Sequence, residues 1–390
     1  MAETRKSSRL MDMEKYIPDF RYPKDTAEVE FVQATREDGA AINDLYNRAF
    51  GQERTFEEYL WKYWDNPAGP PFGILAREKE SGKYLSTSTG VQKQVWIQGR
   101  EVPTILTCET SSDPDARGGG RLFKGVMQGF GVAVNDERGI VWSYGGQSSD
   151  EAIKIGKRWF GFRIVVELVA WECVLSLEPA LRSRLKGLGG VAAGLLNPFF
   201  RGRWKSCGTG LELREVQRFD EAFDSLWQEQ RDRYGVVFWR DAATLNWRYV
   251  DNPFWKHRIV RAERDGRLVG YAVWREWEDE GTRIATVLDC WHGEDAKVVA
   301  GLLDHMRRAA AKTGCAFLRF AIREGGVEQQ VFENELGGRR SPYERVDKII
   351  CTPMPGSTPY EQSEDAYQVL GAVMDGSNWY YCQGDCDYRD

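Results

Sequence analysis

The sequence predicts an α+β (α/β) protein with two tandem domains, each containing a sheet flanked by helices. Two observations support this prediction. Strand-like and helix-like patterns alternate along the first half of the chain. In addition, the segment Trp61 to Pro67 recurs in similar form as Trp247 to Pro253, at an offset of 186 residues (247 minus 61). A repeat of that length usually reflects a duplicated domain.

Hydrophobic spacing assigns the elements of the first half. Apolar side chains at Ile42, Leu45 and Tyr46 share one face of a helix. The Asn66-Pro67 pair ends the helix that precedes it, because a residue before proline avoids helical geometry. The predicted order is strand 29–35, helices 38–50 and 55–64, strands 72–78, 84–98 and 102–109, helix 122–134, strand 140–144, helix 149–159 and strand 163–171.

A glycine-rich turn joins the strand at 102–109 to the helix at 122–134. Its three glycines, Gly118, Gly119 and Gly120, allow the backbone to approach a ligand closely. The first N–H groups of the helix and its positive dipole end then form an anion site, to which Arg117 and Arg121 add charge. The residues alone are consistent with a pyrophosphate site and equally with a plain turn.

The second copy repeats the order of elements but not this turn. Its predicted elements are strands 255–263, 267–277 and 283–290, helix 295–313, strand 316–321, helix 327–336 and strand 343–351. The turn equivalent to the glycine turn runs from Trp291 to Asp295 and contains one glycine and two carboxylates. We therefore expect only the first copy to bind an anionic ligand.

The chain divides into four parts: an N-terminal arm at 1–28, a first domain at 29–175, a linker helix region at 176–208, and a second domain with a C-terminal tail at 209–390. The arm is charged and is expected to be partly disordered unless it docks. The linker contains an apolar stretch at 185–200 between basic residues, about half of the ~20 residues that span a bilayer. A linker helix packed between the domains is favoured over peripheral contact with a membrane.

Composition narrows the class of protein. Of 390 residues, 42% are hydrophobic and 29% charged, as in ordinary globular proteins, and the net charge of −6 argues against a nucleic-acid binder. Residues 1–24 contain no apolar signal segment, so the eight cysteines are interpreted as reduced thiols in a cytoplasmic protein. With three histidines and no zinc-like spacing, we predict no metal site, Cys382 and Cys386 being the closest pair of cysteines.

The segment Asp113-Pro114-Asp115-Ala116-Arg117-Gly118-Gly119-Gly120 resembles the acyl-CoA signature of the GCN5-related N-acetyltransferases (GNATs), Arg/Gln-x-x-Gly-x-Gly/Ala after the fourth strand. Arg117 and Gly120 match the first two fixed positions, and Leu122 stands where the family has Gly or Ala. The order of elements and Gly161-Phe162 also resemble this family. The resemblance implies two GNAT-like domains, each with a mixed, mostly antiparallel sheet, and acetyl-CoA or another acyl-CoA as co-substrate.

Acyl transfer to an amine defines the candidate site. The resemblance implies that the donor contacts a contiguous set of residues on and after the fourth strand: Thr110, Ser111, Ser112, Arg117, Gly118, Gly119, Gly120, Arg121 and Leu122. Glu109 is the first candidate for the general base, with a structural role as the alternative. The family's usual acid is a tyrosine on the fourth helix, where this chain has Lys157, so Tyr144 is the nearest substitute. Cys108 is interpreted as a core residue.

The sequence thus predicts an acyl-CoA-dependent N-acyltransferase, most simply an acetyltransferase, acting on a small-molecule, amino-sugar or peptide amine. Two alternatives stay open: a non-catalytic acyl-CoA-binding or scaffold protein, and a tandem transferase that uses an aminoacyl-tRNA donor. In tandem members of the wider superfamily, such as the N-myristoyltransferases, the C-terminal end enters the active site of the other half. Whether the chain's own C-terminal end does so, through Asp385, Asp387 or the carboxylate of Asp390, is an open hypothesis.

Overall fold

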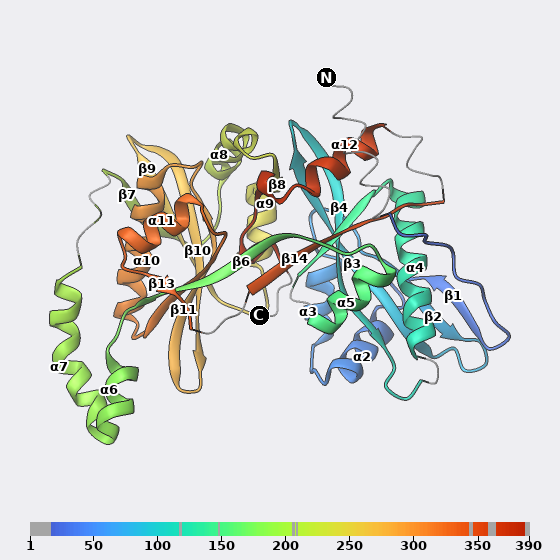
Figure 1. The fold of residues 1–390 in the computed structure, drawn as a ribbon, viewed down its shortest axis with the longest axis horizontal. Helices are drawn as coiled ribbons and strands as arrows, with labels where there is room; N and C mark the ends of the chain where they lie inside the picture. The colour runs from blue at the N-terminus through green and yellow to red at the C-terminus, as the bar shows by residue number, and fades with distance from the viewer. Residues whose placement is uncertain are drawn as a thin grey trace.

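The computed structural model describes residues 17–116, 119–146, 149–204, 207, 210–342, 346–357 and 364–386. These residues form two lobes side by side, with the first half of the sequence in one lobe and most of the second half in the other (Figure 1). A single 15-stranded sheet, counted over the described residues, runs through both lobes. The predicted α+β fold is therefore confirmed.

The first half follows the predicted order closely. Its elements are β1 (Val29–Gln33), α2 (Gly39–Phe50), α3 (Phe56–Tyr63), β2 (Phe72–Glu78), β3 (Tyr84–Ile97), β4 (Arg100–Ser112), α4 (Gly119–Arg138), β5 (Trp142–Gly145), α5 (Asp150–Trp159) and β6 (Arg163–Val174). Local signals fix several ends: the side chain of Thr55 caps α3 in a capping box with Glu58, and Ser149 caps α5.

Two helices, α6 (Glu178–Leu185) and α7 (Gly189–Gly202), connect the halves. The second half then contains β7 (Glu212–Val216), α8 (Glu221–Gln230), β8 (Val236–Phe238), α9 (Ala242–Leu245), β9 (His257–Arg264), β10 (Arg267–Asp279), β11 (Thr282–Trp291), α10 (Ala296–Lys312), β12 (Phe317–Ile322), α11 (Val327–Asn334), β13 (Arg339–Arg340), β14 (Val346–Pro353), α12 (Glu364–Val373) and β15 (Trp379–Tyr380). A short π-helical segment, Asn246–Val250, follows α9 and carries the repeated motif.

Each half contributes strand residues to the sheet of the other half. In the first half, β14 lies antiparallel between β5 and β6, although it comes from the end of the second half. In the second half, the strand beside β12 is β6, which pairs with it from Val169 to Val174. The main path of the sheet is therefore β1-β2-β3-β4-β5-β14-β6-β12-β11-β10-β9-β7. Off this path, β13 pairs with β6, β8 with β3, and β15 with β8. The domain boundaries at 29–175 and 209–390 stay a prediction, since the sheet is continuous across them.

The repeated tryptophans meet where the two copies contact each other. The indole N–H of Trp61 donates to the carbonyl oxygen of Trp247 at 3.0 Å, and the indole N–H of Trp247 donates to the carbonyl oxygen of Trp61 at 3.0 Å. The two rings stack with centroids 5.4 Å apart and planes 26° from parallel. Both side chains are buried. The motif found by sequence repetition thus forms a symmetric contact between the two copies.

The described part of the N-terminal arm docks on helix α4. Phe20 is buried, and a Cβ on Gly131 would lie 2.2 Å from its ring, so only glycine fits there. Pro23 packs on Gly129 in the same way, because a Cβ on Gly129 would lie 3.0 Å from the Cδ of Pro23. The hydroxyl of Tyr22 also donates to the carboxylate of Asp136 at 2.9 Å. The glycines in the middle of α4 are therefore explained by this close packing.

The linker region does not lie between the two halves. Helices α6 and α7 form a hairpin that projects from the lobe of the second half, on the side away from the first half (Figure 1). Several of its apolar side chains are exposed, among them Leu195 at 68% and Phe199 at 76%. The prediction of a packed linker helix is therefore wrong, because the apolar pattern alone does not distinguish a buried face from an exposed one. No described helix is long and apolar enough to cross a membrane.

The contact between the copies gives a first testable prediction. Trp61→Phe and Trp247→Phe each remove a donor and leave a buried carbonyl oxygen without its partner, so each should lower the free energy of unfolding by about 1–3 kcal/mol beyond the effect of lost ring volume. Trp171→Phe is the control, because its buried indole N–H has no hydrogen-bond partner in the structure. Denaturant titration measures all three variants. Equal losses in all three would contradict a role for the reciprocal hydrogen bonds.

Candidate functional site

Strands β4 and β5 separate shortly after they meet. They pair in parallel at two positions only, Ile105 with Ser143 and Leu106 with Tyr144. On its other side β4 is bulged: its register against β3 shifts between Thr87 and Thr89. Glu109 lies at this bulge with a φ of +56°, a left-handed conformation that costs energy for a residue with a side chain. Beyond Leu106 the edge of β4 is therefore open toward β5.

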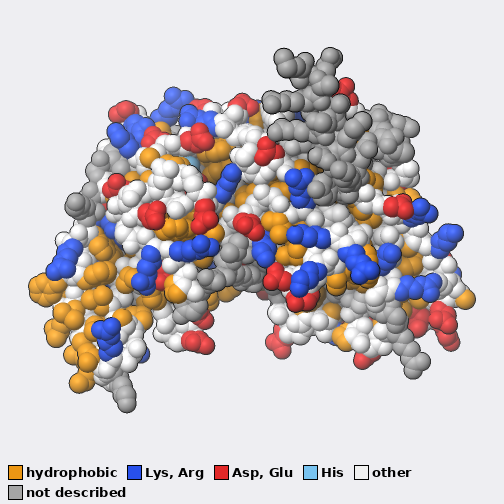
Figure 2. Space-filling model, in the orientation of Figure 1, with side chains coloured by type: hydrophobic (Ala, Val, Ile, Leu, Met, Phe, Trp, Pro, Cys, Tyr) orange, Lys and Arg blue, Asp and Glu red, His pale blue; other side chains and the backbone are white. Residues whose placement is uncertain are grey.

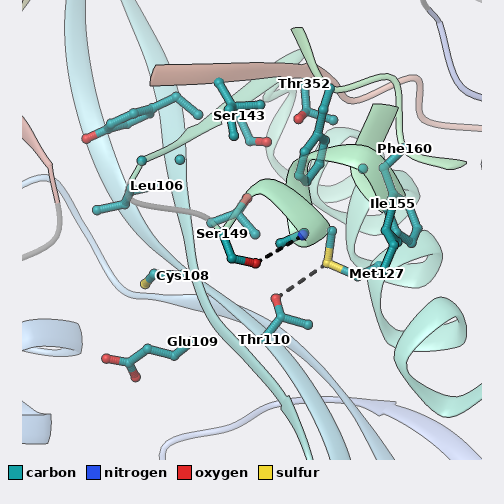
Figure 3. A pocket seen from close by; sticks show the side chains of 18 of the residues that line it. Leu106, Cys108, Glu109, Thr110, Met127, Ser143, Ser149, Ile155, Phe160 and Thr352 are labelled. Carbon is teal, nitrogen blue, oxygen red and sulfur yellow. Dashed lines mark hydrogen bonds between the residues drawn. The ribbon is translucent and has the colours of Figure 1, made fainter. Parts of the chain in front are cut away.

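The gap between the strands opens into a cavity of about 680 Å³. That volume is within the range of about 300–1,000 Å³ that is usual for small-molecule sites. The walls come from β4, β5, α4, α5, α2 and β14, so distant segments of the chain meet here. Figure 3 shows the side chains of β4 on one side and those of α5 and β14 on the other.

The cavity has an apolar interior with a few polar groups. Met127 on α4 and Ile155 and Phe160 on or after α5 supply much of the apolar wall (Figure 3). The hydroxyl of Thr110 lies 3.4 Å from the sulfur of Met127, and that of Ser149 accepts a hydrogen bond from the N–H of Ala152 at 3.1 Å. Such a lining suits a long, mostly apolar ligand with a few hydrogen-bonding groups.

The structure describes the start of α4 from Gly119 onward. The helix begins at Gly119, and a Cβ on Gly120 would have no atom within 4 Å, so the space beside Gly120 is open. Arg121 is exposed in the first turn, whereas Leu122 is buried and packs into the core below α4. Leu122 therefore supports the helix from inside. Arg117 and Gly118 lie outside the described residues.

The loop before α4 is held by a buried carboxylate. Asp113 accepts hydrogen bonds from Arg48 at 2.6 Å and from the N–H of Asp115 at 2.9 Å, and it pairs with Lys83 at 2.8 Å. Burial would raise the pKa of Asp113, but the hydrogen bonds from Lys83 and Arg48 outweigh burial and hold it well below its usual value. These contacts fix the direction in which the chain approaches the glycine turn.

Ser111 and Ser112 connect the cleft to this loop without lining the cavity. The hydroxyl of Ser86 on β3 donates to the carbonyl oxygen of Ser111 at 2.8 Å and lies 2.9 Å from the hydroxyl of Ser112. Thr110 is the member of the predicted Thr-Ser-Ser contact set that lines the cavity.

The carboxylate of Glu109 belongs to a buried charge cluster. Arg54 donates to it at 2.6 Å, Lys62 at 2.5 Å and the hydroxyl of Tyr63 at 2.7 Å. Burial alone would raise the pKa of Glu109, but the positive charges of Lys62 and Arg54 and the hydrogen bonds lower it to about 2. In Figure 3 the carboxylate points away from Ser149 and Met127. A carboxylate of such low pKa is a weak proton acceptor, and its contacts hold the bulge of β4 in place.

Tyr144 and Cys108 also line the cavity but are held by the protein. The hydroxyl of Tyr144 donates to the carbonyl oxygen of Asp385 at 2.8 Å. Cys108 is buried, 3.6 Å from the hydroxyl of Tyr63. The C-terminal segment therefore reaches the first half through its main chain, while the side chain of Asp385 turns to Arg240 and Arg248. Asp387 and Asp390 lie outside the described residues.

The second half contains a counterpart of the Glu109 cluster. Arg240, Arg248 and Tyr249 stand 186 residues after Arg54, Lys62 and Tyr63 (240 minus 54), and they surround Asp289 and Asp385. Extending the sequence repeat upstream to Arg54 and Arg240 was the signal that could have revealed both clusters.

At the start of α10, the counterpart of α4, a carboxylate of the protein occupies the first N–H groups. Helix α10 begins after Asp295, whose carboxylate already accepts the N–H groups of Lys297 and Val298 and pairs with Arg264 at 3.0 Å. A second cavity of about 620 Å³ lies beside it, lined in part by residues 377–382 of the C-terminal segment. An anionic ligand at the first N–H groups of α10 would compete with the carboxylate of Asp295. Among the described residues, no group of three or more His, Cys, Asp or Glu side chains is placed to hold a metal ion.

No family model matches the chain, and no curated protein matches it in sequence. Solved structures do match in fold. A GCN5-related N-acetyltransferase from Anabaena variabilis has a TM-score of 0.57 at 12% identity, covering 83% of this chain and 72% of that one. A probable N-acyltransferase from Enterococcus faecalis has a TM-score of 0.58 at 13% identity, covering 83% and 71%.

The yeast N-myristoyltransferase with bound myristoyl-CoA, from Saccharomyces cerevisiae, has a TM-score of 0.52 at 11% identity, covering 86% of this chain and 80% of that one. At these identities the matches establish the fold. The chain therefore has a GNAT-like fold over most of its length, and the resemblance inferred from the sequence is confirmed at that level.

The Glu109 cluster gives a second prediction. Glu109→Gln leaves Arg54 and Lys62 buried without their counter-charge, which should cost about 3–5 kcal/mol of unfolding free energy near neutral pH. The folded-state pKa of about 2 lies below the ordinary 4.5, so the stabilisation is present above pH 4.5 and is lost as the pH falls toward 2. The gap between wild type and Glu109→Gln should therefore shrink over that range.

Denaturant titration at several pH values measures this gap. Glu151→Gln is the matched control, because Glu151 also lines the cavity but is exposed. It should change stability by less than about 1 kcal/mol. A Glu109→Gln variant as stable as Glu151→Gln at neutral pH would show that the cluster does not stabilise the fold.

Proposed function

We propose that this protein is an acyl-CoA-dependent N-acyltransferase, with acetyl-CoA as the simplest donor and an amine of a small molecule, amino sugar or peptide as acceptor. One observation carries the proposal: the gap between β4 and β5 opens into a sizeable cavity beside a helix that begins with glycines. The GNAT-like fold supports the same assignment.

The donor would bind along β4 and the start of α4. The first N–H groups of α4, beside the open space at Gly120, suit the pyrophosphate, and Arg121 adds a positive charge. Arg117 and Gly118 are added to these donor-binding residues because they belong to the acyl-CoA signature in the sequence. The edge of β4 from Thr110 back to Leu106 suits the pantetheine arm, because its ladder with β5 has ended and main-chain groups there can bond a ligand.

In the overall reaction the lone pair of a neutral amine attacks the thioester carbonyl and forms the carbon–nitrogen bond of the amide. The carbon–sulfur bond breaks, the nitrogen loses a proton to a base, and the CoA thiolate takes up a proton and leaves as the thiol. Glu109 and Tyr144 stay our candidates for base and acid. The ion pairs of Glu109 and its pKa of about 2 favour a positioning role for Glu109, in which it holds the bulge that opens the cleft. Tyr144 can donate a proton only when its bond to Asp385 opens.

A second candidate function is binding of acyl-CoA without turnover. One observation favours it: Glu109, Tyr144 and Cys108 are each held by protein groups rather than aimed at a ligand. The aminoacyl-tRNA alternative has no comparable support, because a net charge of −6 does not favour tRNA.

Titration calorimetry with acetyl-CoA and longer acyl-CoAs gives a third prediction. We expect saturable binding of one donor per chain, lost in Gly120→Asp, whose carboxylate would stand beside the bound pyrophosphate. Both Gly120→Asp and the control Gly120→Ala should fold, because the space at Gly120 is open and an acidic residue suits the first turn of a helix. Gly120→Ala should retain affinity within about threefold, the effect of less than 1 kcal/mol.

An amine library then separates catalysis from simple binding, with release of free CoA thiol as the readout. Turnover with any amine supports the enzyme. Donor binding without turnover supports the second candidate. Unchanged affinity in Gly120→Asp would contradict the placement of the pyrophosphate, and absence of binding to every acyl-CoA would contradict both candidates.

A further inference from the structure

Helix α7 presents an apolar face to solvent. Five side chains on or just before it, Leu188, Val191, Leu195, Leu196 and Phe199, are each between 45% and 76% exposed. They recur at intervals of three and four residues, so they lie on one side of the helix. Figure 2 shows these apolar side chains gathered over the projecting hairpin of α6 and α7. A contiguous apolar face of this kind on a protein surface usually marks a contact.

The opposite face of α7 fastens the hairpin to the body of the protein. Asn197 accepts a hydrogen bond from the N–H of Leu177 and donates to the hydroxyl of Ser176, both at 2.9 Å. Arg201 donates to the carbonyl oxygen of Leu175 at 2.9 Å, and Ala193 is buried. Polar contacts on the opposite side of α7 therefore hold the helix with its apolar face toward solvent.

Basic side chains flank the apolar face. The stretch 176–204 contains five basic residues and one acidic residue, Glu178, in a chain whose net charge is −6. Glu178 is already paired with Arg182 at 2.6 Å. Arg184 lies in the last turn of α6 and Arg203 just after α7, and both are exposed. Positive charge is thus concentrated where the apolar side chains are.

We propose that the α6–α7 hairpin docks the protein on an anionic lipid surface. The exposed side chains of α7 would enter the boundary between headgroups and acyl chains, and Arg184 and Arg203 would contact the lipid phosphates. The hairpin projects from the rest of the molecule, so its exposed side chains can reach a flat surface (Figure 1). A second copy packed through the same hairpin would bring Arg184 and Arg203 of both copies together, so like-charge repulsion disfavours that contact, whereas anionic lipid pairs with these charges.

Sedimentation with lipid vesicles tests the proposal on the full chain. Wild type should bind vesicles of phosphatidylcholine mixed equally with phosphatidylglycerol more tightly than vesicles of phosphatidylcholine alone. Leu195→Glu with Phe199→Glu should weaken binding by at least about tenfold, since burying one such side chain contributes that factor. Arg184→Gln with Arg203→Gln should weaken it on the order of 25-fold with anionic vesicles only, about fivefold for each charge.

Phe56→Glu is the matched control, because Phe56 is another exposed aromatic, at the start of α3, and an acidic residue suits that position. It should leave vesicle binding unchanged, and thermal melts should show that all variants are folded. No binding of wild type to anionic vesicles would overturn the proposal. So would equal loss in Phe56→Glu, or a dimer in solution that Leu195→Glu with Phe199→Glu dissociates while vesicle binding is unaffected.

Discussion

The exchange of β6 and β14 between the two halves is the constraint on which the rest of the structure depends. Strand β14 lies beside β5 and supplies Ile350 and Thr352 to the cavity wall, so the first copy has a complete cleft only when the second copy is present. The stacked pair of Trp61 and Trp247 holds the copies in the relation that this exchange requires. In the described residues the two halves therefore share one continuous sheet and are not two separate modules.

Within this body the two copies have taken different roles. In the first, α4 begins with glycines and its first turn faces open space. In the second, Asp295 caps α10 and the C-terminal segment borders the cavity. The buried clusters around Glu109 and around Asp289 and Asp385 are nonetheless preserved in both. Both halves contain such a cluster, although only α10 has a carboxylate, that of Asp295, at its first N–H groups in the described residues, which fits a role of the clusters in strand geometry more than in chemistry.

Much of the fold could be predicted because its signals are local. The Asn66-Pro67 pair predicted the end of α3 closely, and the sequence repeat contains the two tryptophans that form the contact between the halves. The site was harder. The partners of Glu109 lie 46 to 55 residues before it, and the repeat that relates them to Arg240, Arg248 and Tyr249 does not show which carboxylate they surround.

Two features could not be read from the sequence at all. An alternating pattern shows that β14 is a strand but not which strand it joins. Likewise, the spacing of apolar residues in α7 is the same for a buried and for an exposed face. The sequence therefore predicted, wrongly, that this helix packs between the domains. In both cases the missing information is long-range packing, which residue periodicity does not carry.

A crystal structure with CoA bound tests the central claim most directly, namely that the first copy alone holds an acyl-CoA. We predict one CoA per chain, with its pyrophosphate at the start of α4 and its pantetheine arm between β4 and β5. CoA in the second cavity, beside Asp295, or CoA bound away from both cavities would contradict the claim.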